Sequence, residues 1–217
     1  MQLTEMGKTR SRLNHLATQL AVANTHLHIY QKLRTEFAGS LKGKFYKSKD
    51  FWGFTLSAHF QIAVLNLCRL YDDHKCAFSL HRFLKDIPKE RFKPPENDLW
   101  NTDIAYVSGQ SLFRPLVKLK EWRNNIIGHS NYRTSSGGME EFLEKNPVAI
   151  EEIQKLIDDG FSILERWTYH YEDKCIQERI DDGRSQRRTY RRLSDGSKDV
   201  DYLLELMRSD SGSDQAS

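Results

Sequence analysis

The segment FWGFTLSAHFQIAVLNLCRLY, residues 51–71, is apolar on nearly every face when it is built as a helix. A helix with apolar side chains all round is stable where other elements cover it, because none of its sides favours contact with water. We therefore predict that residues 51–71 form the central helix of a helical bundle. Five aromatic residues of the chain are predicted to lie in the core rather than to serve as stacking platforms: Phe51, Trp52, Phe54, Trp122 and Trp167.

Two long amphipathic helices are predicted on either side of the central helix. The first is expected to end near Gly39. The second is expected to begin with Asn146 as its cap and Pro147 as its first helical residue. Gly160 weakens the second helix by about 1 kcal/mol relative to alanine, which packing is expected to offset. The apolar positions that repeat at helical spacing are Leu13, Leu16, Leu20, Ala23, Leu27, Tyr30 and Phe37 in the first helix, and Ile150, Ile153, Ile157, Leu164, Trp167 and Tyr171 in the second.

Shorter elements are predicted in the rest of the folded part. The basic segment LKGKFYKSKD, residues 41–50, is expected to be a connector, and Ser79 is expected to cap a short helix, LHRFLKDI. Residues 98–111 are a further helical candidate, and a helix with Pro115 in its first turn is predicted to continue to Gly128. The sequence shows no strand alternation and no internal repeat, so we predict an all-α, up-and-down bundle of four to five helices.

The composition changes after residue 178. Residues 1–178 are predicted to form the helical domain, and residues 179–217 a charged, flexible tail with a short helix at 200–207 that docks on this protein or on a partner. Arginines in the tail either grip RNA through its phosphates or belong to a solvated linker. These arginines are Arg184, Arg187, Arg188, Arg191 and Arg192.

The totals of the chain limit its location and its partners. With 33 Lys and Arg against 30 Asp and Glu in 217 residues, the net charge is +3, so the whole domain does not attract nucleic acid strongly. Cys68, Cys76 and Cys175 show no CxxC spacing and are expected to be reduced thiols. The chain has neither a signal-peptide pattern nor an apolar run of about 18 residues. We therefore expect a cytoplasmic protein that does not engage a membrane.

Metal and cofactor sites are not indicated by the sequence. His26 and His28 are two residues apart and face different directions on a helix, and neither has a further His or Cys at a ligand spacing. The run Asp72-Asp73-His74 either binds a cation or is a solvated helix end. No phosphate-binding loop, dinucleotide fingerprint or GxSxG elbow occurs. We expect no metal and no cofactor.

The segment RNNIIGH, residues 123–129, combines residue types that suit RNA cleavage without metal. An imidazole such as His129 acts as a general acid or base near neutral pH. The guanidinium of Arg123 offers a planar fork of donors to a phosphate and keeps its proton. Asn124 is suited either to orienting the histidine or to binding the phosphate. The competing structural interpretation is a helix end, where Arg123 pairs with Glu121 or another acid and His129 contacts terminal carbonyl groups.

This motif stands among helices that resemble a known family. Together with the two long outer helices, the central helix ending RLYDD and the short SLHRFL helix, it resembles the abortive-infection (AbiU-like) branch of the HEPN superfamily over residues 10–175. Members of the superfamily are small helical bundles, and many are metal-independent ribonucleases. The resemblance implies that Arg123 and His129 are catalytic, that Asn124 supports them, and that the protein is a homodimer with an antitoxin or regulatory partner. One departure is Tyr132, three residues beyond the histidine, where HEPN toxins paired with a nucleotidyltransferase antitoxin have tyrosine two residues beyond.

The spacing of the motif bears on how a site would form. On an ideal α-helix, six residues at about 100° each leave Arg123 and His129 roughly 120° apart. Either Gly128 breaks the helix and turns His129 back, or two protomers combine their motifs across a two-fold axis. Our leading hypothesis is a metal-independent endoribonuclease of toxin or phage-defence type. The alternatives are a non-catalytic helical module that binds RNA or a protein, and a structural interaction protein that docks through residues 200–207.

Overall fold

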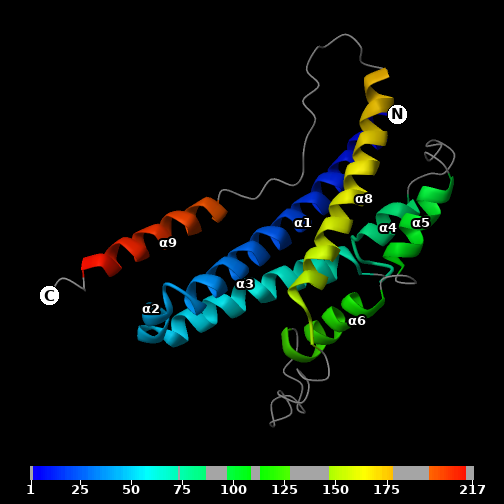
Figure 1. Ribbon diagram of the computed structural model, residues 1–217. Helices are drawn as coiled ribbons and strands as arrows, with labels where there is room; N and C mark the ends of the chain where they lie inside the picture. The colour runs from blue at the N-terminus through cyan, green and yellow to red at the C-terminus, as the bar shows by residue number, and fades with distance from the viewer. Residues whose placement is uncertain are drawn as a thin grey trace.

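The computed structural model describes residues 2–72, 74–86, 97–108, 113–127, 147–177 and 196–213. Among these residues it contains helices and no strand, which confirms the predicted all-α fold (Figure 1). The described helices outnumber the four to five that were predicted. They are α1 (Gln2–Ala38), α2 (Lys42–Lys47), α3 (Lys49–Leu70), α4 (Leu80–Asp86), α5 (Asn97–Val107), α6 (Phe113–Trp122), the π-helical segment η1 (Arg123–Ile127), α8 (Ile150–Gln177) and α9 (Gly196–Ser213).

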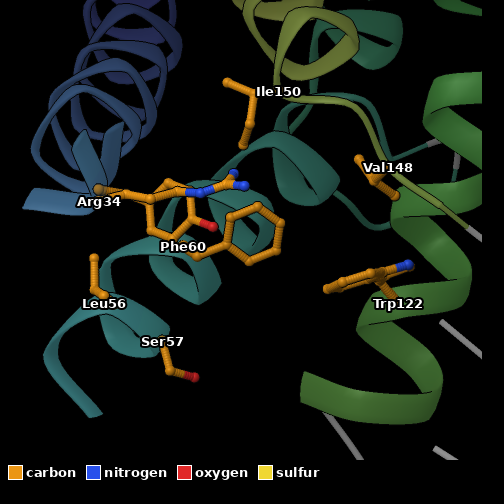
Figure 2. Close-up of a pocket in the computed structure, with 8 residues that line it drawn as sticks. Arg34, Leu56, Ser57, Phe60, Trp122, Val148 and Ile150 are labelled. Atoms are coloured by element: carbon orange, nitrogen blue, oxygen red, sulfur yellow. The ribbon is translucent and has the colours of Figure 1, made fainter. Parts of the chain in front are cut away.

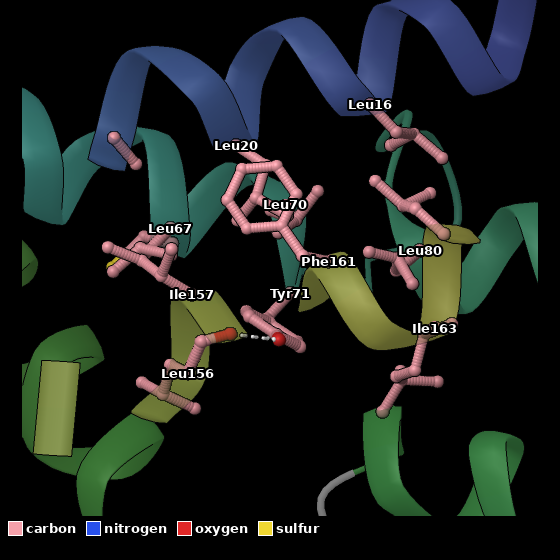
Figure 3. Close-up of a cluster of buried hydrophobic side chains, with 14 of the residues drawn as sticks. Leu16, Leu20, Leu67, Leu70, Tyr71, Leu80, Leu156, Ile157, Phe161 and Ile163 are labelled. Carbon is pink, nitrogen blue, oxygen red and sulfur yellow. Dashed lines mark hydrogen bonds between the residues drawn. The ribbon is translucent and has the colours of Figure 1, made fainter. Parts of the chain in front are cut away.

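The core forms where α1, α3 and α8 meet. Figure 1 shows α3 and α8 both running in the direction opposite to α1. The leucines of α1 that were predicted from the helical repeat, including Leu16, Leu20 and Leu27, are fully buried. Tyr71, at the end of α3, is also buried, and its hydroxyl donates a 2.7 Å hydrogen bond to the carbonyl oxygen of Leu156 in α8 (Figure 3). This bond satisfies the buried hydroxyl and fixes the end of α3 against α8.

The prediction that α3 is central along its whole length is wrong for its first half. Its buried residues all lie in the second half, namely Ala63, Val64, Leu67, Cys68 and Leu70. In the first half the side chains of Phe51 and Phe54 are 62% and 77% exposed, against the prediction that they lie in the core. Trp52 is half-buried, with its ring 4.8 Å from that of Phe37 in α1. The first half of α3 extends past α8 (Figure 1), so α1 covers one side of it and its outer face remains exposed. Among the described residues α3 is also the helix with the length and apolar composition of a membrane span, although its second half is packed in the bundle.

Local capping interactions explain where the shorter helices begin. Ser79 is the predicted cap of α4, and its Oγ accepts a 3.3 Å hydrogen bond from the backbone N–H of Arg82, which confirms the prediction. Residues 42–47 of the predicted connector form the short helix α2 instead. The predicted start of α8 at Pro147 is wrong, because α8 begins at Ile150. Glu152 caps this start by accepting a 3.1 Å hydrogen bond from the N–H of Ala149, as the glutamate of a capping box does.

The C-terminal helix α9 packs on α1. Leu204 is 1% exposed and joins a cluster of residues from α1, α2 and the turn between them, Ile29, Leu33, Phe37, Leu41 and Phe45. Ion pairs between Lys32 and Asp201 and between Glu36 and Arg208 flank this contact. The apolar segment 200–207 therefore lies in a helix that docks on its own chain. The arginines of the predicted tail, Arg184, Arg187, Arg188, Arg191 and Arg192, lie outside the described residues.

Candidate functional site

The RNNIIGH motif begins where α6 changes into a π-helix. Trp122 is the last residue of α6, and residues 123–127 form η1, although the sequence predicted an α-helix up to Gly128. A π-helical turn is wider than an α-helical turn because each N–H bonds to the carbonyl five residues earlier. Such turns are rare and are frequently found at functional sites. The α-helical angle of roughly 120° between positions 123 and 129 therefore does not apply through this segment.

Arg123 lies at the surface, where two side chains hold its guanidinium group. Its Nε donates a 3.0 Å hydrogen bond to Oδ1 of Asn124. Its Nη1 lies 3.8 Å from Oδ2 of Asp72, and the side chains of Arg123 and Asp72 are 32% and 27% exposed. Asn124 is exposed. The structure thus brings Arg123 and Asn124 together outside the packed core, where a ligand can reach them.

Asp72 is a site residue that sequence reasoning did not assign. It follows α3 directly, and its Oδ1 accepts a 2.9 Å hydrogen bond from the backbone N–H of His74, which fixes the carboxylate in a local turn. The other oxygen, Oδ2, is then directed at Arg123. The sequence contained a signal for it, since the Asp72-Asp73-His74 run was interpreted as either a cation site or a solvated helix end. The cation near Asp72 is the guanidinium of Arg123.

Glu121, the other acid considered as a partner of Arg123, has a different contact. Its Oε2 accepts a 3.0 Å hydrogen bond from the side-chain amide of Asn125, which also donates to the Glu121 carbonyl oxygen at 2.9 Å. The acid paired with Arg123 therefore comes from the end of another helix. This pairing places the first residues of the motif against the loop after α3.

The thiol of Cys68 lies beneath this site and is unreactive. Its Sγ is 3.5 Å from the carbonyl oxygen of Leu119, so it joins α3 to α6. Burial raises the pKa of Cys68 to about 11, although the positive charges of Arg123 and Lys120 act in the opposite direction. The thiol therefore stays protonated at neutral pH and does not serve as a nucleophile.

A pocket of about 420 Å³ lies beside Trp122, between α1, α3, α6 and the start of α8 (Figure 2). The rings of Phe60 and Trp122 meet edge to face, with centroids 5.4 Å apart, and the Tyr30 and Phe60 centroids are 5.2 Å apart. The pocket is lined by Tyr30, Arg34, Leu56, Ser57, Phe60, Trp122, Val148 and Ile150. It is therefore mostly apolar, with one cationic residue.

The described part of the chain contains no cluster of three or more His, Cys, Asp or Glu side chains that could hold a metal ion. His26 does have a histidine partner that the sequence did not indicate. Its Nδ1 lies 2.8 Å from Nδ1 of His59, so the two rings share a hydrogen bond between α1 and α3. His129, the remaining residue of the predicted catalytic set, lies outside the described residues.

Comparison with protein families agrees with this arrangement of helices and motif. The model of the family HEPN AbiU2 matches residues 6–196 of the 217 residues. The chain belongs to the HEPN AbiU2 family. Comparisons with curated proteins and with solved structures give no match. As an AbiU2 protein, the chain is a HEPN-type abortive-infection module, which confirms the predicted superfamily and branch. The AbiU2 match contains Asp72, the whole RNNIIGH motif and α8, and it ends where α9 begins.

Proposed function

We propose that this AbiU2 protein is a cytoplasmic, metal-independent endoribonuclease of toxin or phage-defence type. Arg123 stabilises the reacting phosphate, Asn124 supports it, and His129 is the general acid or base. The observation that carries the proposal is the guanidinium of Arg123, held at the surface by Asn124 and Asp72, six residues before a histidine. A surface arginine fixed on both sides is suited to binding a phosphate without reorganising.

The proposed reaction needs no group beyond these side chains. A base removes the proton from a ribose 2′-hydroxyl, whose oxygen attacks the adjacent phosphorus. The O2′–P bond forms, the P–O5′ bond breaks, and an acid protonates the leaving 5′-oxygen, so that a 2′,3′-cyclic phosphate and a 5′-hydroxyl result. His129 serves one of the two proton transfers, and the second copy of His129 in a homodimer would serve the other.

The contacts of Arg123 leave donors for the substrate. Its Nε is bonded to Asn124 and its Nη1 faces Asp72. Among the described residues, the N–H groups of Nη2 then remain for the phosphate oxygens, on which negative charge increases in the transition state. A lysine has a single charged nitrogen, so it could not use separate nitrogens to contact its protein partners and the phosphate.

Cleavage of total RNA and tRNA in EDTA tests the proposal. We expect the wild-type protein to cut RNA, and Arg123→Ala and His129→Ala each to lower the rate by at least about 100-fold. Arg10→Ala is the matched control, because it removes an exposed arginine of α1 that is not part of the motif. Equal cleavage by the wild type and both site variants would dispose of the proposal.

A second candidate is a non-catalytic module that binds RNA. The observation that favours it is the exposed corner formed by α2 and the start of α3, where Tyr46, Phe51 and Phe54 stand among exposed lysines. Exposed aromatic rings beside cations bind single strands by stacking and by phosphate contacts. This candidate predicts RNA binding without cleavage, and binding that survives His129→Ala. The binding should weaken when Phe51 and Phe54 are both replaced by alanine, or when the tail arginines are removed.

A further inference from the structure

We propose that the pocket beside Trp122 is a nucleobase subsite, which holds one unpaired base of an RNA strand while Arg123 binds a neighbouring phosphate. The inference rests on the proposed function, because it names the form of RNA that the same site takes. It assigns a ligand class, a single-stranded nucleotide, to a cavity that the AbiU2 match leaves unassigned.

The lining of the pocket suits a flat aromatic ligand. Three of its residues, Tyr30, Phe60 and Trp122, carry aromatic rings, and their packing keeps the rings in fixed orientations. Bases stack on such rings with little sequence preference, because every base has a π-face. The volume of about 420 Å³ falls within the range of about 300–1,000 Å³ that small-molecule sites have.

The charge of the pocket selects an anionic ligand. Arg34 is exposed, and Figure 2 shows its side chain reaching from α1 toward the middle of the pocket, on the side opposite Trp122. No ion-pair partner of Arg34 occurs within the described ranges. A guanidinium beside aromatic rings favours a ligand that combines a ring with a phosphate. A phosphate gains the attraction of the Arg34 charge, which an uncharged ligand lacks, and a cationic ligand would be repelled.

The position of the pocket connects it to the candidate catalytic residues. Trp122 forms one wall and is followed directly by Arg123, which turns toward Asp72. A base against Trp122 and a phosphate at Arg123 would therefore belong to adjacent parts of one strand. Bases in a duplex are paired and stacked, so only a single-stranded or looped segment could place a base here.

Ser57 allows the pocket to be closed without removing any of its aromatic residues. It is exposed at the pocket, and its Oγ accepts a 2.9 Å hydrogen bond from the side-chain amide of Gln61 on the same helix. A tryptophan at position 57 would fill the opening. The neighbouring Ala58 is also exposed but does not line the pocket, since successive helical residues point about 100° apart. Ser57→Trp and Ala58→Trp are thus a matched pair.

The experiment measures binding of a fluorescent 2′-fluoro RNA hexamer, which lacks the attacking hydroxyl, by anisotropy on the full chain. A hexamer of the same backbone without bases is the second probe. We expect the wild type and Ala58→Trp to bind the RNA hexamer equally, and Ser57→Trp to bind it about tenfold more weakly. The hexamer without bases should bind to the wild type about tenfold more weakly than the RNA hexamer does. Its affinity should be the same for all three proteins. Arg34→Gln should weaken binding of the RNA hexamer several-fold.

The subsite would be overturned by unchanged RNA binding of Ser57→Trp, or by equal affinity of the wild type for the two hexamers. Absence of RNA binding by the wild type would overturn it as well. Because the probes cannot be cut, these outcomes are independent of cleavage. The nuclease proposal fails if His129→Ala still cuts RNA or if the wild type does not cut it. Neither result changes what the binding measurement says about the pocket.

Discussion

At the scale of single residues, Arg123 is held by one near and one distant partner. Asn124 is its neighbour in the chain, while Asp72 belongs to the turn after α3. Asp72 does not need to touch the substrate to matter. By fixing one edge of the guanidinium it limits the directions in which the remaining donors point, and misplacement of such a group costs up to about 100-fold in rate.

Asp72→Ala is therefore expected to lower kcat for RNA cleavage by about tenfold while KM changes little, because Arg123 stays present but loses its orientation. Stability should change by less than about 1 kcal/mol, since the pair is partly exposed. Steady-state kinetics and thermal unfolding provide the measurements. Asp158→Ala, which removes an exposed carboxylate from α8, is the control. A kcat equal to that of the wild type would mean that Asp72 does not position Arg123.

At the scale of helices, the His26–His59 pair links α1 to α3. A hydrogen bond between the two Nδ1 atoms requires one ring to donate and the other to accept, so at least one ring is neutral. Burial lowers the pKa of His26, and burial together with the charge of His26 lowers the pKa of His59. Protonation of both rings would remove the acceptor and place two positive charges between the helices.

The sign of the pH dependence follows from these shifts. The folded-state pKa values lie below the unfolded value of about 6.5, so the unfolded chain binds more protons between the two. The free energy of unfolding should therefore decrease as the pH falls through and below about 6.5. We expect His59→Gln to reduce the fall in Tm between about pH 7.5 and pH 5.5. His15→Gln, at an exposed position of α1, should retain the wild-type fall. An identical pH profile for His59→Gln and the wild type would contradict this account.

At the scale of the whole molecule, Gly160 allows the three core helices to approach one another. A Cβ atom at this position of α8 would lie 3.0 Å from the hydroxyl oxygen of Tyr71 and 3.2 and 3.3 Å from the two methyl carbons of Leu20. The hydroxyl is fixed by its bond to Leu156, and Leu20 is fully buried, so neither neighbour moves freely. The glycine that weakens an isolated helix is required by its tertiary neighbours.

Gly160→Ala should consequently destabilise the protein by about 1–2 kcal/mol, because overpacking outweighs the gain of about 1 kcal/mol in helix propensity. Gly53→Ala is the matched control in α3, where the added Cβ would meet no atom within 4 Å beyond its chain neighbours and the nearby backbone of its own helix. That variant should gain up to about 1 kcal/mol. Urea unfolding measures both, and opposite signs are the expected result. A stabilised Gly160→Ala protein would show that the close approach is not tight.

Features that depend on near neighbours could be predicted well. The leucine repeat of α1, the Ser79 cap of α4 and the all-α fold rest on contacts within one or two helical turns. In the candidate site, the helical segment that carries Arg123 and Asn124 was predicted on the same basis, although it is π-helical from Arg123 onward. Asp72 was visible as an acid after α3, but its partner is fixed by packing between α3 and α6.

The sequence by itself determined the helical class, most helix positions and the family, because helical spacing and capping are local and the family motif is linear. Tertiary structure alone decided which apolar residues are covered, and it left Phe51 and Phe54 exposed because α8 does not cover the first turns of α3. It also decided that Asp72 holds Arg123 and that Gly160 faces Tyr71. The apolar character of a side chain predicts that it favours burial, but the packing of helices that are distant in sequence decides which residues cover it.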